Sequence, residues 1–181
     1  IVEVDGPAAE CDYLIGEIAR IASENGAVTS RISENEAERM AFWAGRKAAF
    51  PAVGRISPDY LCMDGTIPRR RLPQVLRRME ELSAHHGLGV ANVFHAGDGN
   101  LHPTILTDER DKEEMVRVES AIRSLIDAAL ELGGTISGEH GIGFAKAPFL
   151  AREVGQETIE IMRRIKHALD PNNILNPGKF V

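Results

Sequence analysis

Two histidines, His95 and His102, flank a glycine-rich turn at a spacing that would let them share a metal ion. They lie in segment 92–102, Asn-Val-Phe-His-Ala-Gly-Asp-Gly-Asn-Leu-His, between two runs typical of strands. If Gly97–Asn100 is the hairpin turn, His95 lies opposite His102. Directly opposed residues point to the same face, with Cβ atoms roughly 4.5–5.5 Å apart. Two such imidazoles can bind one cation at about 2.0–2.1 Å each, so the spacing predicts a metal site.

A second glycine-rich segment, 138–143 (Gly-Glu-His-Gly-Ile-Gly), follows a short predicted strand at 135–137. Glycine allows a backbone to approach a ligand closely, which makes Glu139 the predicted third ligand. Its neighbour His140 projects differently and is the candidate for acid–base work. Zn, Mn and Fe all accept two histidines and a carboxylate, so the metal's identity stays open. The glycine order is not the GxGxxG of a dinucleotide loop.

Less specific readings of the same residues stay open at this point. The two hairpin histidines could be surface residues without a role, because pairs of histidines are weak signals. Asp98 could be a ligand, although an Asp between two glycines is typical of the turn itself. His85 and His86 end a predicted helix, where they are expected to interact with the helix dipole rather than with a metal.

The elements that must position these residues alternate between short strands and amphipathic helices. Strands are predicted at 1–4, 27–32, 89–95, 102–106 and 135–137, with 52–70 irregular. Helices are predicted around 14–22, over 34–50 with a Ser33–Glu36 capping box and Pro51 as its end, over 72–82, from Asp108 to Gly133 as the longest, and over 156–168. This order predicts an α+β fold, an antiparallel sheet covered by helices on one face.

The composition describes one domain with a core, since 43% of the 181 residues are hydrophobic. The net charge of −6 argues against nucleic acid as a partner, and the short cluster 69–71 is expected to be solvated. Two distant cysteines, Cys11 and Cys62, fit a reducing, cytoplasmic compartment. No apolar run approaches the roughly 18 residues of a membrane span. The chain opens inside a predicted strand, which suggests a fragment of something longer.

Three segments, FHAGDGNLHP, SGEHGIGFAK and LDPNNILNPGK, together resemble the C-terminal domain of FAD-linked oxidases of the vanillyl-alcohol-oxidase type. That family includes glycolate oxidase FAD subunits, D-lactate dehydrogenases and D-2-hydroxyglutarate dehydrogenases. Segment 56–69 looks most like the glycolate oxidase branch. The resemblance covers the whole chain. It implies a ferredoxin-like cap or substrate domain over 1–181, including a tail at 170–181, with the FAD-binding domain absent.

The resemblance also implies roles for individual residues. The implied metal ligands are His95, His102 and Glu139; the base is His140; the substrate carboxylate is held by Arg46; and Asn176 and Lys179 lie near the flavin. A guanidinium suits carboxylate binding through its bidentate geometry. A plain surface arginine and a plain surface turn are the respective alternatives for Arg46 and the tail.

The implied activity is oxidation of a 2-hydroxy acid to the 2-oxo acid by hydride transfer to FAD. Phe50, Cys62 and Thr104 differ from the polar residues of the hydroxyglutarate branch, so a small monocarboxylate such as glycolate or D-lactate is expected. The expected partners are an N-terminal FAD-binding domain and, as in some members, an electron-transfer subunit at the membrane. Two other classes stay open: a metal-dependent hydrolase using Zn-bound water, and a non-catalytic ligand-binding module.

Overall fold

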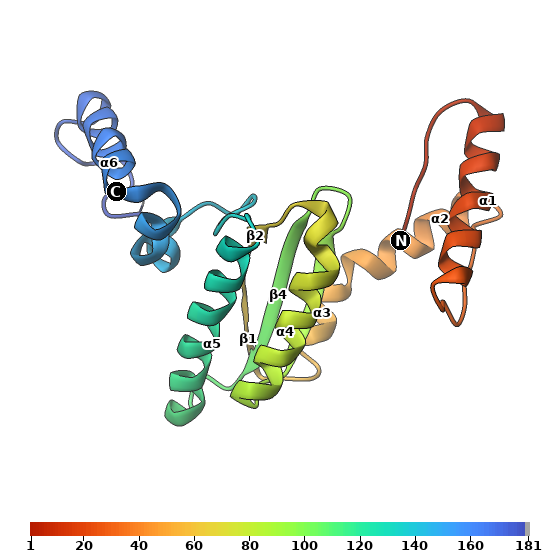
Figure 1. Ribbon diagram of the computed structural model, residues 1–181, viewed down its shortest axis with the longest axis horizontal. Coiled ribbons are helices and arrows are strands. Elements are labelled where there is room, and N and C mark those ends of the chain that lie inside the picture. Colours follow the sequence, from red (N-terminus) through yellow and green to blue (C-terminus); the bar gives the residue numbers. More distant parts are fainter. Residues whose placement is uncertain (180–181) are drawn as a thin grey trace. The chain divides into compact units, whose positions relative to one another are not determined.

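The computed structural model describes residues 1–179 and divides the chain into two compact units, residues 1–50 and the residues from Pro51 onward (Figure 1). The first unit holds α1 (Ala8–Glu24) and α2 (Glu36–Lys47), and α3 (Ala49–Val53) crosses the boundary. Neither α1 nor α2 contains a buried residue. Residues 180–181 of the predicted tail lie outside the described residues.

Two strand predictions in the first unit are wrong, because residues 1–4 and 27–32 form no strand. Within described residues 1–50 neither segment has a strand beside it, and a single segment without a partner forms no inter-strand hydrogen bonds. The predicted first helix is confirmed as α1. The second helix is shorter than predicted: Asn35, not Ser33, caps it by accepting from Glu38 N, and Pro51 lies within α3.

The second unit is built on a four-stranded antiparallel sheet. Its strands are β1 (Asp59–Cys62), β2 (Gly65–Thr66), β3 (Val90–His95) and β4 (Asn100–Thr107). β4 is central: β3 pairs with one edge, while β1 and β2 pair with the other in a single continuous register. The prediction that 52–70 is irregular is therefore wrong, since this segment supplies one interrupted edge strand.

Helices α4 (Leu72–His86) and α5 (Lys112–Glu131) cover one face of this sheet (Figure 1). A 3-10 turn, η1 (Arg69–Arg71), leads into α4. The core between helices and sheet contains Leu101 and Ile105 of β4, and its other buried members are Ile67, Val75, Met79, Leu82, Leu88, Val118, Ala121, Leu125 and Ala128. The α+β prediction, with helices on one face, is confirmed.

Thr135 forms an isolated bridge with Thr66, so it extends the sheet beyond β2. The Thr135 hydroxyl contacts the Thr66 hydroxyl at 2.7 Å, and Thr135 N donates to Thr66 O at 3.0 Å. The predicted strand at 135–137 is thus reduced to one bridge. With it, the order along the chain is β-α-β-β-α-β, the ferredoxin-like arrangement.

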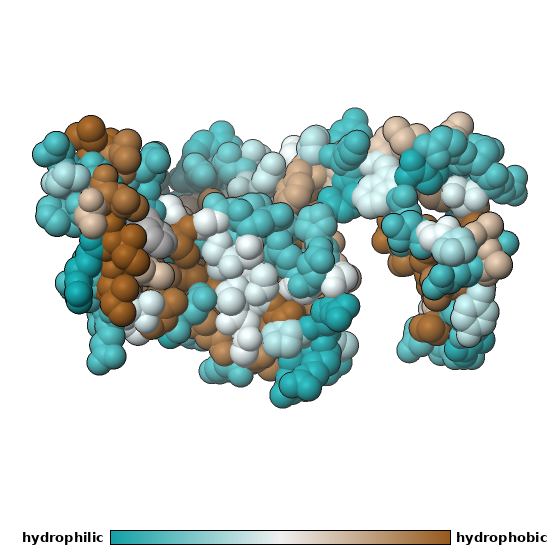
Figure 2. Space-filling view, turned by 90° about the horizontal axis from the view of Figure 1, so that it is seen from above, coloured by the Kyte–Doolittle hydropathy of each residue, from teal (hydrophilic) through white to brown (hydrophobic). Residues whose placement is uncertain are grey.

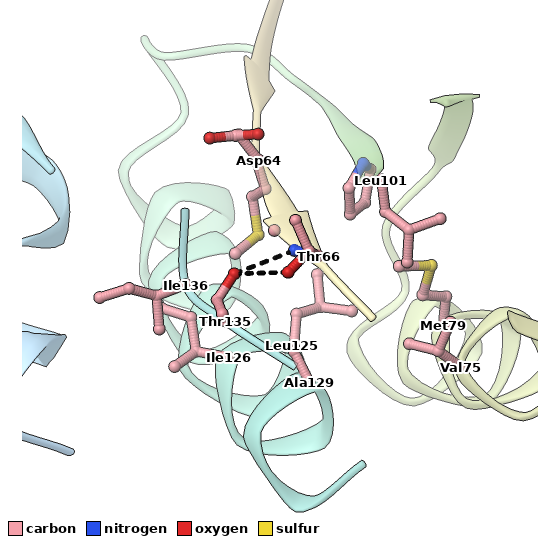
Figure 3. Close-up of a pocket in the computed structure, with 13 residues that line it drawn as sticks. Asp64, Thr66, Val75, Met79, Leu101, Leu125, Ile126, Ala129, Thr135 and Ile136 are labelled. Carbon is pink, nitrogen blue, oxygen red and sulfur yellow. Dashed lines mark hydrogen bonds between the residues drawn. The ribbon is translucent and has the colours of Figure 1, made fainter. Parts of the chain in front are cut away.

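A cavity of about 30 Å³ lies between this sheet and the two covering helices (Figure 3). Its lining includes Leu101, Leu125, Ile136 and the backbone side of Asp64. The Asp64 carboxylate points away from the cavity (Figure 3). Asp64 therefore borders the apolar core, while its carboxylate lies on the other side, away from the cavity.

Helix α6 (Gly143–Leu169) is longer than the helix predicted at 156–168, and non-helical backbone at Gly155 (φ 78°, ψ 159°) divides it. Leu150 of its first half and Ile159 of its second half form a second core with Ile126 of α5 and Ile136. α5 begins at Lys112 with Asp111 as its N-cap, later than the predicted start at Asp108.

Exposed apolar side chains gather on the second half of α6 and the turn after it, at the left of Figure 2. They are Ile161, Ile165, Leu169, Ile174 and Leu175. Clusters of this kind are typical of contact surfaces. None of the described helices combines the length and apolarity that a membrane crossing requires.

Candidate functional site

The hairpin histidines lie on one face of the sheet, but not directly opposite each other. The turn is Ala96–Gly99, so His95 opposes Asn100 and Val93 opposes His102. The predicted pairing of His95 with His102 is wrong by two positions because the turn starts one residue earlier. An even shift leaves every side chain on its face. His95 and His102 are therefore diagonal neighbours, with ring centroids 5.6 Å apart and ring planes at 88°.

Gly99 fixes this turn against the residues that follow β2. Its backbone has φ 74°, and its carbonyl accepts a 2.8 Å hydrogen bond from Ile67 N. A Cβ at this position would lie 2.2 Å from Ile67 O, which no side chain can tolerate. Glycine is required here for both reasons.

Pro103 explains the interruption between β1 and β2 and the orientation of His102. Met63 N donates to Pro103 O at 2.9 Å, but proline has no N–H to return a bond to Met63 O. Met63 O instead lies 3.4 Å from Nδ1 of His102. In the tautomer with the proton on Nδ1, this hydrogen bond leaves the Nε2 lone pair available to a metal.

The loop after Ile136 is held by one buried carboxylate. Asp64 accepts hydrogen bonds from three consecutive backbone amides, Gly138 N at 3.0 Å, Glu139 N at 3.2 Å and His140 N at 2.9 Å. Convergent backbone N–H groups of this kind form an anion-binding nest. The anion bound here belongs to the protein itself.

Two side chains complete the environment of Asp64. Ser137 Oγ donates to its carboxylate at 2.9 Å and Lys146 Nζ at 3.0 Å. Burial alone would raise the pKa of Asp64, but the hydrogen bond from His140 N and the Lys146 ammonium hold that pKa well below its usual range. The Asp64 carboxyl is therefore ionised at neutral pH.

The loop brings Glu139 and His140 to the hairpin histidines. Glu139 Oε1 lies 2.9 Å from His102 Nε2, 3.8 Å from His95 Nε2 and 3.9 Å from His140 Nε2. The His140 ring stacks on that of His102, with centroids 4.9 Å apart and planes at 8°. One carboxylate oxygen is thus surrounded by three imidazole nitrogens.

This donor set fits a divalent transition metal. Ligand bonds of about 2.0–2.2 Å place neighbouring donor atoms roughly 3–3.5 Å apart in tetrahedral or octahedral geometry. The observed separations of 2.9, 3.8 and 3.9 Å bracket that range. The chemistry, imidazole nitrogen with carboxylate oxygen, suits Zn, Mn or Fe.

The donor atoms that lie within 4.8 Å of one another are those of Asp64, His102, Glu139 and His140, a group that does not include the predicted ligand His95. Asp64, however, already accepts from three amides, a hydroxyl and an ammonium. Those donors occupy its lone pairs, so it anchors the loop instead of binding an ion. His140 has the position for a ligand or a base.

The site is open on one side. His102 is 3% exposed and forms its floor, whereas the side chains of His95 and His140 are 48% exposed and that of Glu139 is 51% exposed. A small molecule arriving from solvent can reach the three outer groups. Asp98 lies exposed in the turn, as expected of a turn residue.

Three predicted residues lie elsewhere. Arg46 is half-buried on α2 of the first unit, beside a hollow lined by Ile1, Val2, Arg31, Phe42 and Gly45. Asn176 and Lys179 follow α6 and contact each other, Lys179 Nζ lying 3.4 Å from Asn176 Oδ1. Lys179 also lies over the ring of Phe144 at 5.9 Å. Asn176 and Lys179 are not part of the histidine cluster.

Sequence reasoning missed Asp64, Pro103 and Lys146. Asp64 stood in a segment predicted to be irregular, and its loop partners are more than 70 positions away. Continuing the β4 register would have placed Asp64 opposite His102, but that register follows from pairing, not from local pattern. Lys146 belongs to the SGEHGIGFAK motif, in which the glutamate and histidine carry the predicted metal and acid–base chemistry and the lysine has no local signal of its role.

Comparison with known proteins matches residues 1–180 to the family of FAD linked oxidases, C-terminal domain. The chain is 48% identical over 181 residues to "Glycolate oxidase subunit GlcD" of Escherichia coli (strain K12), covering 100% of this chain and 36% of that protein. It is 40% identical over 180 residues to "Glycolate oxidase subunit GlcD" of Bacillus subtilis (strain 168), covering 99% and 38%.

The similarity extends to a second group of relatives. The chain is 33% identical over 182 residues to "Probable D-lactate dehydrogenase, mitochondrial" of Danio rerio, covering 99% of this chain and 37% of that protein. It thus spans little more than a third of the length of these relatives. The match over residues 1–180 shows that the chain belongs to the family of FAD linked oxidase C-terminal domains.

Proposed function

We propose that this chain is the substrate-binding part of an FAD-dependent 2-hydroxyacid oxidoreductase of the glycolate oxidase or D-lactate dehydrogenase type. The observation that carries the proposal is the convergence of His95, His102 and His140 on one Glu139 oxygen. An open cluster of potential metal ligands in a domain of FAD-linked oxidases suits a small chelating substrate. The names of the relatives support glycolate and D-lactate as the first substrates to test.

His95, His102 and Glu139 are the proposed metal ligands. His102 is buried and lies beside Met63 O, so it offers a fixed donor, while the half-exposed His95 and Glu139 would hold a bound ion from the solvent side. A metal bound there would supply Lewis acidity that orients the 2-hydroxyl and lowers its pKa.

His140 is the proposed general base. Its Nε2 lies 3.9 Å from Glu139 Oε1, next to the place a hydroxyl would take, and its ring is held by stacking on His102. In the proposed reaction His140 Nε2 takes the substrate hydroxyl proton, and FAD, when bound by a partner domain, would supply the acceptor for the hydride from C2. One proton and one hydride removed from the alcohol yield the 2-oxo acid.

Arg46 is the proposed partner of the substrate carboxylate, because a guanidinium can bind both of its oxygens. Asn176 and Lys179 are proposed to face the flavin. Thr104 is buried and its hydroxyl donates to His102 O at 3.2 Å, so it has no role in binding a second carboxylate. This supports a monocarboxylate substrate. We further propose an electron-transfer subunit as a partner, since relatives are themselves named as subunits.

The test is turnover by the FAD-loaded holoenzyme with glycolate, D-lactate and D-2-hydroxyglutarate. For His140→Ala we expect kcat to fall about 10²–10⁴-fold with unchanged FAD and metal content, as for loss of a general base. The control is His85→Ala, an exposed histidine at the end of α4, which should turn over normally. Near-normal turnover by His140→Ala would refute the base assignment, and flavin-independent ester hydrolysis by the wild type would point to a hydrolase instead.

A further inference from the structure

We infer that Asp64 is the positioning residue of this site: its buried carboxylate fixes the backbone of residues 138–140 and so determines where Glu139 and His140 lie relative to His102. The roles of Glu139 and His140 rest on the proposed function. The inference about their backbone is argued from the contacts of Asp64 and does not depend on those roles.

The backbone of residues 138–140 curls around the Asp64 carboxylate. Three consecutive amides, of Gly138, Glu139 and His140, all donate to it at 2.9–3.2 Å. Consecutive N–H groups converge on one point only in a curled backbone, and this curl directs the two side chains outward. Without this central acceptor the three part-buried amides would lose their charged partner, and the curl of the backbone would lose what stabilises it.

Asp64 also connects the loop to the strand that carries the buried histidine. The register that pairs Cys62 with Thr104 and Gly65 with Leu101 sets Asp64 opposite His102. Asp64 Oδ1 lies 3.9 Å from His102 Nδ1. One side chain therefore contacts both halves of the cluster, the floor histidine and the loop that supplies the outer groups.

The buried charge of Asp64 is compensated by the ammonium of Lys146. The Asp64 side chain has no solvent exposure, and an unpaired carboxylate there would be strongly disfavoured. Lys146, at the start of α6, donates to Asp64 Oδ2 at 3.0 Å, to Asp64 O at 3.1 Å and to Ser137 Oγ at 3.2 Å. Lys146 thereby connects α6 to the same carboxylate.

The experiment compares wild type, Asp64→Asn and Val118→Ala in the full chain. Asp64→Asn removes the charge and replaces one acceptor oxygen with a donor. Val118→Ala truncates a fully buried side chain on α5, away from the cluster, and serves as the matched destabilised control. Two quantities are measured: amide hydrogen exchange of residues 138–140 relative to β4, and the Kd for Zn²⁺ alone.

The exchange ratio is the amide exchange rate of residues 138–140 divided by that of β4. In Asp64→Asn this ratio should be at least about tenfold higher than in Val118→Ala, because hydrogen bonds to a charged acceptor are lost. The Kd for Zn²⁺ should rise about 10–100-fold, as for the loss of an outer-shell partner of metal ligands. If Asp64→Asn does not fold, Ser137→Ala removes a single donor to Asp64 and should raise the exchange ratio about three- to tenfold.

Unchanged exchange in these variants would overturn the inference, as would faster exchange with Zn²⁺ affinity equal to that of Val118→Ala. If the wild type itself binds no Zn²⁺, the proposed metal site fails, yet the exchange ratio still decides whether Asp64 orders the loop. The two failures are therefore distinguishable.

Discussion

Replacing Gly138 with alanine should open the site by a distance that the structure defines. A Cβ on Gly138 would lie 2.5 Å from Asn100 Oδ1 and 2.9 Å from both Asn100 Cγ and Asp64 Oδ1. Ordinary contact begins at 3.4 Å, so the shortfall is 3.4 − 2.5 = 0.9 Å. Asn100 is buried and Asp64 is held by its donors, so neither can yield by that amount. The loop must retreat instead.

A retreat of 0.9 Å would carry Glu139 with it. The Glu139 Oε1 to His102 Nε2 distance would lengthen from 2.9 to as much as 2.9 + 0.9 = 3.8 Å. Metal–ligand distances tolerate deviations of only about 0.2 Å, so the Kd for Zn²⁺ should rise about 10–100-fold. Overpacking of this kind should also lower the free energy of unfolding by about 1–3 kcal/mol.

The assay is calorimetric titration with Zn²⁺ beside urea unfolding, and the matched control is Gly97→Ala. Gly97 lies in the hairpin turn, its backbone φ is not positive, and a Cβ there would meet no heavy atom within 4 Å. Gly97→Ala should therefore bind Zn²⁺ like the wild type. If Gly138→Ala matched Gly97→Ala in both affinity and stability, the steric account of the loop would be refuted.

Two further changes test the core and the tail. Leu125→Ala enlarges an existing cavity of about 30 Å³ (Figure 3), which cannot collapse further, so it should cost about 2–5 kcal/mol of unfolding free energy; a urea midpoint within error of wild type would contradict this. Lys166, with the backbone amides of Leu175 and Ile174, lowers the pKa of Asp170 to about 2. Because this folded-state pKa is below the ordinary value of about 3.9, Asp170 stabilises the tail at higher pH, and that contribution is lost as pH falls from about 4 to about 2. Amide exchange at 174–175 should rise over that interval in wild type and be pH-insensitive, after intrinsic-rate correction, in Asp170→Asn; equal profiles would contradict the assignment.

Most helices could be predicted from sequence because each carries an apolar stripe of helical period, as α4, α5 and α1 do. The edge strand at 59–66 could not, because its two pieces are four and two residues long and are formed only by pairing with β4. The opposite error is a predicted strand that does not form. It occurs at residues 1–4 and 27–32, which have strand composition but no partner strand among the described residues of their unit.

The faces of the hairpin could be predicted even though its register was wrong. Starting the turn one residue early shifts opposing pairs by two, so His95 and His102 stay on one face. What local sequence could not supply was Asp64, whose partners lie in a loop beyond α5. The resemblance carried by three motifs is confirmed by the family match, while the individual site residues stay predictions.

The most direct test of the central claim is the metal content of the purified protein, measured by plasma mass spectrometry beside a His95→Ala/His102→Ala double variant. The cluster around Glu139 predicts about one equivalent of a divalent transition metal per wild-type chain, and little or none in the variant. Because His95 is half exposed but His102 is buried, folding of the variant is checked by circular dichroism beside the metal measurement. Absence of metal from the wild type after reconstitution, or equal metal in both proteins, would contradict the account.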